Sequence, residues 1–220
     1  MPDPGAVAFL QTRMALFYLL QSAYAAPLTP DVADSLTECF TVYGALLDWE
    51  GPGLDPWDPD RDSPEFYRLF VGPGSLIAPP YESIYRSLDG LLMQAETLSV
   101  RAAYQEAGLQ KREGQGEPDD HLPLELEFYA RLQYQALSAY QASDWAAADQ
   151  LLATQAQFHK DHLNRWVPAF CTKVLAGSLS PFYRSLARLT RETLRTETQV
   201  LSAVTSLIAT EGGANHERAI

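Results

Sequence analysis

Apolar residues recur at helical spacing along nearly the whole of this 220-residue chain, and no segment shows the clean alternation of a half-buried strand. The stretch from Phe9 to Ala26 is typical, because its apolar residues follow one helical face and its polar residues lie off that face. The residues of this face are Ala6, Phe9, Leu10, Leu16, Phe17 and Leu20. The pattern predicts an all-α fold.

Prolines and glycines gather in three stretches, at 51–60, 71–80 and 108–118, and divide the chain into about eight or nine helices. We therefore expect one bundle-like helical domain over residues 1–210. The charged, glycine-containing stretch at 108–118 is predicted to be a hinge between two lobes, 1–110 and 119–210. Gly212 and Gly213 predict a flexible tail over 211–220.

Two predicted helices bear on function. Ser63-Pro64-Glu65 is expected to open a short helix, and a longer one is expected from Gly90 to Ala107, ended by Gly108. The apolar face predicted for the longer helix is Leu91, Leu92, Ala95, Leu98 and Ala102. Asp119 or Asp120 is expected to cap the helix that follows, which has Pro123 in its first turn. The apolar stripe of that helix is Leu122, Leu126, Tyr129, Leu137 and Tyr140.

The chain has 16 basic and 28 acidic residues, a formal net charge of −12. Such a charge repels phosphate backbones and argues against a nucleic-acid partner. It either keeps the protein soluble or attracts a cationic peptide.

Cys39 and Cys171 form no metal motif or disulfide framework, which is typical of a reducing compartment. No apolar run is long enough to span a membrane. Asp3 and Arg13 argue against a secretory signal at the N-terminus.

Three familiar site types fit the sequence poorly. Gly72-Pro73-Gly74 lacks the lysine and hydroxyl residue of a phosphate-binding loop. His159 and His162 have a spacing that allows them to share a metal, but no matching Glu-x-x-His motif accompanies them. Ser83 lies in no Gly-x-Ser-x-Gly elbow, so a hydrolase is disfavoured. A helical metal- or nucleotide-binding protein remains the alternative function.

Two segments stand out from ordinary helical sequence. The segment 66–85 places many apolar residues beside a Gly/Pro-shaped loop, and these residues either fill the core or form a surface. Residues 117–121 (EPDDH) place three acids and a histidine at a helix start, more acids than capping alone explains. Neighbouring acids are expected to favour the protonated form of His121.

Residues 67–73 (YRLFVGP), 79–85 (PPYESIY), 117–121 (EPDDH), 124–128 (LELEF) and 158–170 (FHKDHLNRWVPAF) together resemble the TorD/DmsD/NarJ family of redox-enzyme maturation chaperones. The resemblance covers roughly residues 10–180 in order. Tyr81 departs from the pattern, because close relatives often have Trp there.

The resemblance implies a cytoplasmic chaperone that is not an enzyme. Such proteins bind the twin-arginine signal peptide on the precursor of a molybdopterin oxidoreductase, delay its export and assist cofactor insertion. The resemblance also implies no cofactor beyond guanine nucleotide, and either a monomer or a domain-swapped dimer. It predicts the following signal-peptide-binding residues: Phe66, Leu69, Phe70, Leu76, Pro80, Tyr81, Glu117, Asp119, Asp120 and His121.

Overall fold

The computed structural model describes residues 2–111 and 116–218, and every regular element in these ranges is a helix. The prediction of an all-α fold is confirmed. An isolated antiparallel bridge between Tyr81 and His121 is the single β-type contact recorded among the described residues. No helix in this part of the chain is both long and apolar enough to cross a bilayer.

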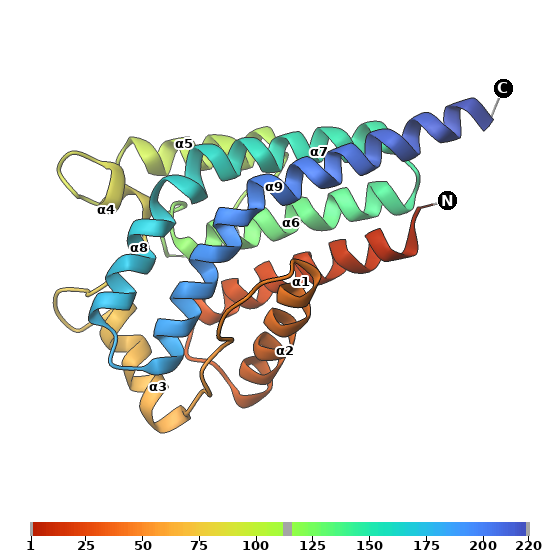
Figure 1. Ribbon diagram of the computed structural model, residues 1–220. Helices are drawn as coiled ribbons and strands as arrows, with labels where there is room; N and C mark the ends of the chain where they lie inside the picture. Colours follow the sequence, from red (N-terminus) through yellow and green to blue (C-terminus); the bar gives the residue numbers. More distant parts are fainter. Residues whose placement is uncertain (1, 112–115, 219–220) are drawn as a thin grey trace.

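Four helices lie side by side and form the body of the molecule, and two more cover one end of it (Figure 1). Helix α1 packs on α6 and α2, α6 packs on α7, and α9 packs on α7 and α8. The helices of the body are α1 (Pro4–Ala25), α6 (Leu122–Gln141), α7 (Trp145–Phe158) and α9 (Pro181–Arg218), and the covering helices are α2 (Pro30–Leu46) and α8 (Asn164–Gly177).

The remaining elements are short and connect these long helices. They are α3 (Pro59–Phe66), η1 (Tyr67–Val71), α4 (Glu82–Arg86), α5 (Ala95–Glu106) and η2 (His159–Leu163), of which η1 and η2 are single π-helical turns. The expected start at Ser63-Pro64 is wrong. Helix α3 begins at Pro59, because the Asp58 carboxylate caps it by accepting from Asp60 N, and Pro64 lies inside the helix.

The longer helix was expected to begin at Gly90, but α5 begins at Ala95, and the predicted apolar face is also wrong, since all five of its residues are exposed. The helix instead buries Thr97, Val100 and Tyr104. The Tyr104 ring packs 4.5 Å from that of Phe128, and its hydroxyl donates to the carbonyl of Asp119 at 3.0 Å. One aromatic anchor and its hydrogen bond therefore set the rotation of α5, and the leucines face outward.

The C-terminal helix runs farther than the sequence predicted. Gly212 and Gly213 were expected to begin a tail, but α9 continues to Arg218. Residues 112–115 of the predicted hinge lie outside the described residues. One cluster of buried residues extends from Leu16 to Leu194 and so draws on both predicted lobes.

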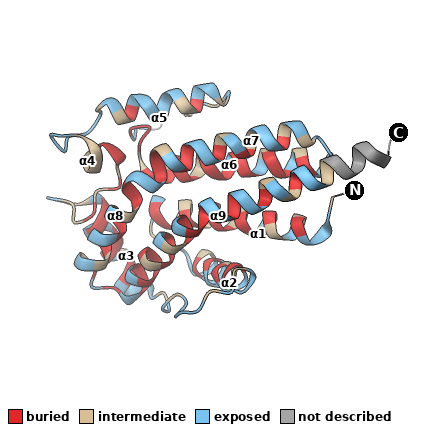
Figure 2. Ribbon diagram, turned by 45° about the horizontal axis from the view of Figure 1, so that its top comes forward, coloured by how far each residue is buried: buried red, intermediate tan, exposed pale blue. Residues whose placement is uncertain are grey.

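The interior holds two hydrophobic clusters. Figure 2 shows the buried residues along the inner sides of the long helices. A group of polar side chains from four helices also lies in the interior. Its members are Arg13 from α1, Tyr129 from α6, Gln155 from α7 and Glu197 from α9. The Arg13 guanidinium forms an ion pair with Glu197, and its Nη2 donates to Gln155 Oε1 at 2.9 Å. Tyr129 donates to Glu197 at 2.6 Å. Arg13 and Glu197 are at most 1% exposed, so each charge depends on the other.

We expect Arg13→Ala to lower the free energy of unfolding by about 3–5 kcal/mol, because it leaves Glu197 buried and without its counter-ion. Urea denaturation followed by circular dichroism measures the change. Arg195→Ala, which breaks the exposed pair with Glu192, serves as the control and should change stability little. Arg13→Met combined with Glu197→Met should recover much of the loss. A double variant no more stable than Arg13→Ala would contradict this account.

Candidate functional site

Two segments far apart in the sequence meet beside the start of α6. The amide of Glu82 donates to the carbonyl of Asp120 at 3.0 Å, and the amide of Leu122 donates to the carbonyl of Pro80 at 2.8 Å. Tyr81 and His121 lie between these two bonds as the paired residues of the bridge. We call this meeting point, residues 80–83 and 117–122, the Tyr81–His121 junction. The two sequence-predicted halves of the site therefore adjoin.

Asp120 is fully buried at the centre of the junction. Its Oδ2 accepts from the amide of Ser83 in the first turn of α4 at 2.9 Å. Its Oδ1 accepts from the hydroxyl of Thr97 in the first turn of α5 at 2.8 Å. Asp119 or Asp120 was expected to cap α6, but that helix has His121 as its N-cap and no side-chain capping bond. The carboxylate instead ties α4 and α5 to the start of α6.

Asp119 is committed to the protein as well. Its carboxylate is 2.7 Å from Nη2 of Arg101, and its backbone carbonyl accepts from Tyr104. Asp119 is buried, whereas Arg101 is largely exposed. Because both aspartates already have partners inside the fold, neither presents an open carboxylate at the surface.

Three predicted site residues do face outward. The Tyr81 ring stacks on the imidazole of His121, with centroids 4.9 Å apart and planes 27° from parallel. The Tyr81 hydroxyl donates to Glu117 Oε2 at 2.7 Å. Glu117 is exposed, and Tyr81 and His121 are partly exposed. This trio combines an aromatic face, an imidazole and a carboxylate, and suits a ligand with apolar and cationic groups.

Neighbouring acids do favour the protonated form of His121, as expected, but burial outweighs them. Burial lowers its pKa from the usual 6.5 to about 4, although Glu117 and Asp120 act to raise it. His121 is therefore neutral at pH 7. The neutral ring contributes as a flat stacking surface and a hydrogen-bonding group, not as a positive charge.

Most of the predicted apolar half faces inward. Phe66, Leu69, Phe70 and Pro80 are buried, and Leu76 is partly buried. Phe70 packs against Phe170 at 5.7 Å and against Tyr24 at 5.8 Å. The interpretation of these residues as a surface is wrong for the four buried ones. Their role in peptide binding stays a prediction.

Beneath the junction lies a buried polar cluster that sequence reasoning missed. Glu82 is fully buried, forms an ion pair with Arg86 and is 2.8 Å from Nδ1 of His162. Trp166 Nε1 donates to Glu125 Oε2 at 3.2 Å, and burial holds the pKa of Glu125 well above its usual range. The sequence pattern carries no sign that Glu125 is buried. The cluster joins α4, α6 and α8 behind the exposed trio.

The histidines of the metal alternative have structural partners. His162 contacts Glu82, and His159 Nε2 lies 2.9 Å from the carbonyl of Leu194. Among residues 2–111 and 116–218, no group of three or more His, Cys, Asp or Glu side chains is arranged to hold a metal ion. Both cysteine thiols are free.

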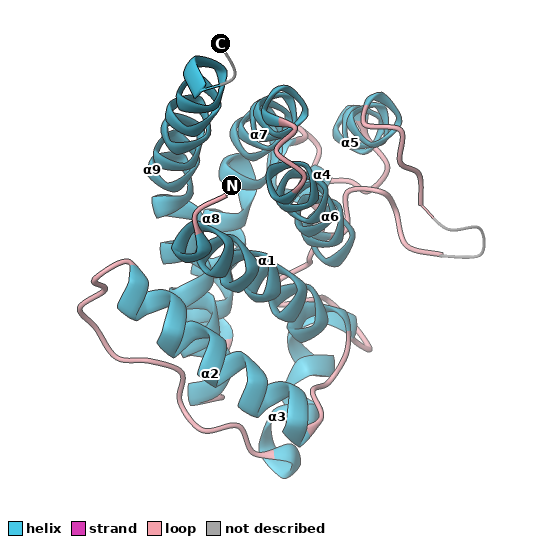
Figure 3. Cartoon of the chain, turned by 90° about the vertical axis from the view of Figure 1, so that its right-hand side faces the viewer, coloured by secondary structure: helices cyan, strands magenta, loops and turns pink. Residues whose placement is uncertain are grey.

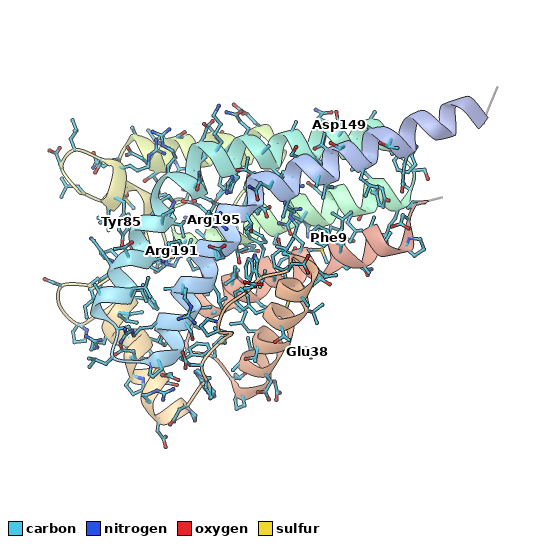
Figure 4. The ribbon with its side chains drawn as sticks, in the orientation of Figure 1. Phe9, Glu38, Tyr85, Asp149, Arg191 and Arg195 are labelled. Carbon is cyan, nitrogen blue, oxygen red and sulfur yellow. The ribbon has the colours of Figure 1, made fainter. Side chains whose placement is uncertain are left out.

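A cleft of about 1060 Å³ lies elsewhere, between α9 and the loop that follows α2. Phe9, Trp49, Arg191 and Arg195 are among its lining residues, and Figure 4 shows the side chains of Phe9, Arg191 and Arg195 in this region. Its charged lining residues are Asp48, Glu50, Arg188, Arg191, Glu192 and Arg195. These three acids and three arginines balance, so charge alone favours neither an anionic nor a cationic ligand. None of the predicted site residues is among those that line it.

Comparison with known proteins identifies relatives of known role. Residues 36–172 match the family model described as nitrate reductase delta subunit. The chain is 32% identical over 125 residues to the chaperone protein TorD of Photobacterium profundum, covering 57% of this chain and 56% of that protein. It is 34% identical over 129 residues to the Tat proofreading chaperone DmsD of Salmonella typhi, covering 58% and 55%. The matched region thus spans little more than half of these relatives.

A solved structure shares the fold. A protein from Archaeoglobus fulgidus, assigned to redox enzyme maturation, superimposes with a TM-score of 0.52 and 20% identity, covering 84% of this chain and 93% of that one. At this identity the likeness concerns the fold alone. The family match contains the whole Tyr81–His121 junction.

Because Asp120 holds the helix starts together, Asp120→Ala should lower the free energy of unfolding by about 1–3 kcal/mol, since Ser83 N and Thr97 Oγ1 lose their buried acceptor. Glu117→Ala removes an exposed carboxylate that takes no part in these bonds, so it should have a much smaller effect. Chemical denaturation of the two variants in parallel measures the difference. Equal stabilities would show that the Asp120 bonds do not hold the junction.

The lowered pKa of His121 predicts a pH dependence of stability. The unfolded chain binds a proton near pH 6.5 and the folded protein only near pH 4, so stability is lost as the pH falls between these values. The loss attributable to His121 should reach at most about 3 kcal/mol. Comparing unfolding of wild type and His121→Gln from pH 7 to pH 4 isolates it. An imidazole that titrates at or above pH 6.5 by NMR would contradict the predicted shift.

Proposed function

Because the chain belongs to the nitrate reductase delta subunit family, which confirms the resemblance to TorD and DmsD, we propose that it is a maturation chaperone and not an enzyme. Its client is proposed to be the precursor of a molybdopterin oxidoreductase, held through its twin-arginine signal peptide until the cofactor is inserted. The observation that carries this proposal is the trio of Glu117, which is exposed, and Tyr81 and His121, which are partly exposed, on a buried framework.

The chemistry of the trio complements such a peptide. Glu117 carries a carboxylate that can accept two parallel bonds from a guanidinium group. Tyr81 and His121 offer a stacked pair of rings over which an arginine or an apolar side chain can lie. The net charge of −12 attracts a cationic peptide from a distance. Asp119 and Asp120 keep the trio in place and do not contact the peptide.

A modest affinity suits a chaperone that releases its client. Burying about 400 Å² of apolar surface gives roughly 10 kcal/mol of gross stabilisation. Ordering a disordered peptide costs about 2–5 kcal/mol, and association costs more. We therefore expect a dissociation constant no tighter than micromolar, which corresponds to a binding free energy of at most about −8 kcal/mol. The affinity should fall as salt is added, because exposed charges are screened.

Three further parts of the proposal follow from family membership. The chaperone is proposed to work in the cytoplasm, where a precursor awaits export. It needs no cofactor of its own for this role, and guanine-nucleotide binding stays a prediction. The choice between a monomer and a domain-swapped dimer also stays a prediction.

Glu117→Gln and Tyr81→Ala should each weaken binding of a twin-arginine signal peptide about tenfold, because each removes part of the exposed trio. Isothermal titration calorimetry at low salt measures the affinity. Tyr134→Ala, which removes an exposed tyrosine on α6 away from the trio, serves as the control. Wild-type affinity in both site variants would refute the site assignment.

A further inference from the structure

An apolar patch lies beside the junction, on the loop between α4 and α5 and on the outer side of α5. Its members are Leu88, Leu91, Leu92, Met93 and Leu98, which are 105%, 57%, 45%, 70% and 63% exposed. These five large apolar residues fall within eleven consecutive positions. Monomeric proteins seldom expose apolar groups in such a concentration unless the surface binds something.

The backbone of this loop is shaped to present the patch. Met93 has a φ of 59°, in the left-handed region that residues other than glycine seldom adopt. Gln94 Nε2 donates to the carbonyl of Leu92 at 2.9 Å and supports this turn. Backbone strain of this kind persists where the surrounding structure enforces it, and it gathers at binding surfaces. Leu91, Leu92 and Met93 lie on this turn and are exposed.

The patch is joined to the junction by short covalent and hydrogen-bonded links. Leu98 follows Thr97, whose hydroxyl donates to Asp120. Leu88 follows α4, whose first turn is bound by the same carboxylate. Figures 2 and 3 show α5 at the outer edge of the molecule, and Figure 2 shows that most of its surface is exposed. Both ends of the patch are thus tied, through Thr97 and through α4, to the carboxylate at the centre of the junction.

The charges around the patch indicate what kind of partner it fits. Arg86 and Arg101, the arginines nearest in sequence, form ion pairs with the buried carboxylates of Glu82 and Asp119. Asp89 within the loop and Glu106 at the end of α5 are exposed. An apolar surface with an acidic border fits an apolar segment that carries positive charge. A second copy of this chain, with a net charge of −12, would be repelled.

We propose that the α4–α5 apolar patch binds the apolar stretch of the same peptide whose arginines reach the Tyr81–His121 junction. This inference rests on the proposed function and adds a second contact surface to it. A peptide lying across both surfaces would place its cationic head at Glu117 and its apolar part along Leu91, Leu92 and Leu98. The length of the apolar stretch would then add to affinity independently of the arginines.

The test uses two synthetic peptides and two variants of the full chain. The long peptide has an arginine pair followed by a Leu/Ala stretch, and the short peptide has the arginine pair without that stretch. The patch variant is Leu91→Ser with Leu98→Ser. The control variant is Leu46→Ser with Leu179→Ser, which alters two exposed leucines elsewhere, at 50% and 79% exposure. Calorimetry gives each affinity, and circular dichroism verifies folding.

The patch variant should bind the long peptide about tenfold more weakly than wild type and the short peptide as tightly as wild type. The control variant should bind both peptides with wild-type affinity. Glu117→Gln should weaken both peptides. If the patch variant keeps full affinity while Glu117→Gln loses it, the patch inference falls and the proposed function stands. If wild type binds neither peptide, both fall. If wild type dimerises in sedimentation velocity and the patch variant is monomeric with unchanged peptide affinity, the patch is a dimer interface and the inference is overturned.

Discussion

The Asp120 carboxylate is the contact on which the candidate site depends. One of its oxygens accepts from the start of α4 and the other from the start of α5, while its backbone leads directly into α6. Helix starts present unsatisfied N–H groups and a positive dipole, so one buried carboxylate stabilises several of them together. This bond pattern brings residue 81 next to residue 121 and holds α5 at the edge of the molecule.

The acidic motif thereby divides into two kinds of residue. Asp119 and Asp120 face inward and satisfy Arg101, Ser83 and Thr97. Glu117 and His121 face outward with Tyr81, where a ligand can reach them. A loss of peptide binding after substitution of Asp120 would therefore mix a structural effect with a binding effect. Substitutions at Tyr81 and Glu117 separate the two.

Much of the fold could be predicted from the sequence, because helical periodicity reports burial directly wherever a helix packs along its whole length. The stripe of α6 is an example, since Leu122, Leu126 and Tyr129 are all buried. At α5 the apolar pattern was misleading, because the helix buries Thr97, Val100 and Tyr104 and leaves Leu98 exposed. The local pattern also did not indicate the direction of Phe66 and Phe70 or the lowered pKa of His121. Those properties depend on neighbours distant in sequence, which the local pattern does not contain.

The central claim is that a cationic, apolar peptide binds at the Tyr81–His121 junction. Titration of ¹⁵N-labelled protein with a twin-arginine signal peptide, followed by NMR chemical-shift mapping, tests this claim most directly. The account predicts that the largest shifts fall on Tyr81, Glu117 and His121 and extend into the loop between α4 and α5. Shifts concentrated at the cleft around Trp49 and Arg191, with the junction unperturbed, would contradict it.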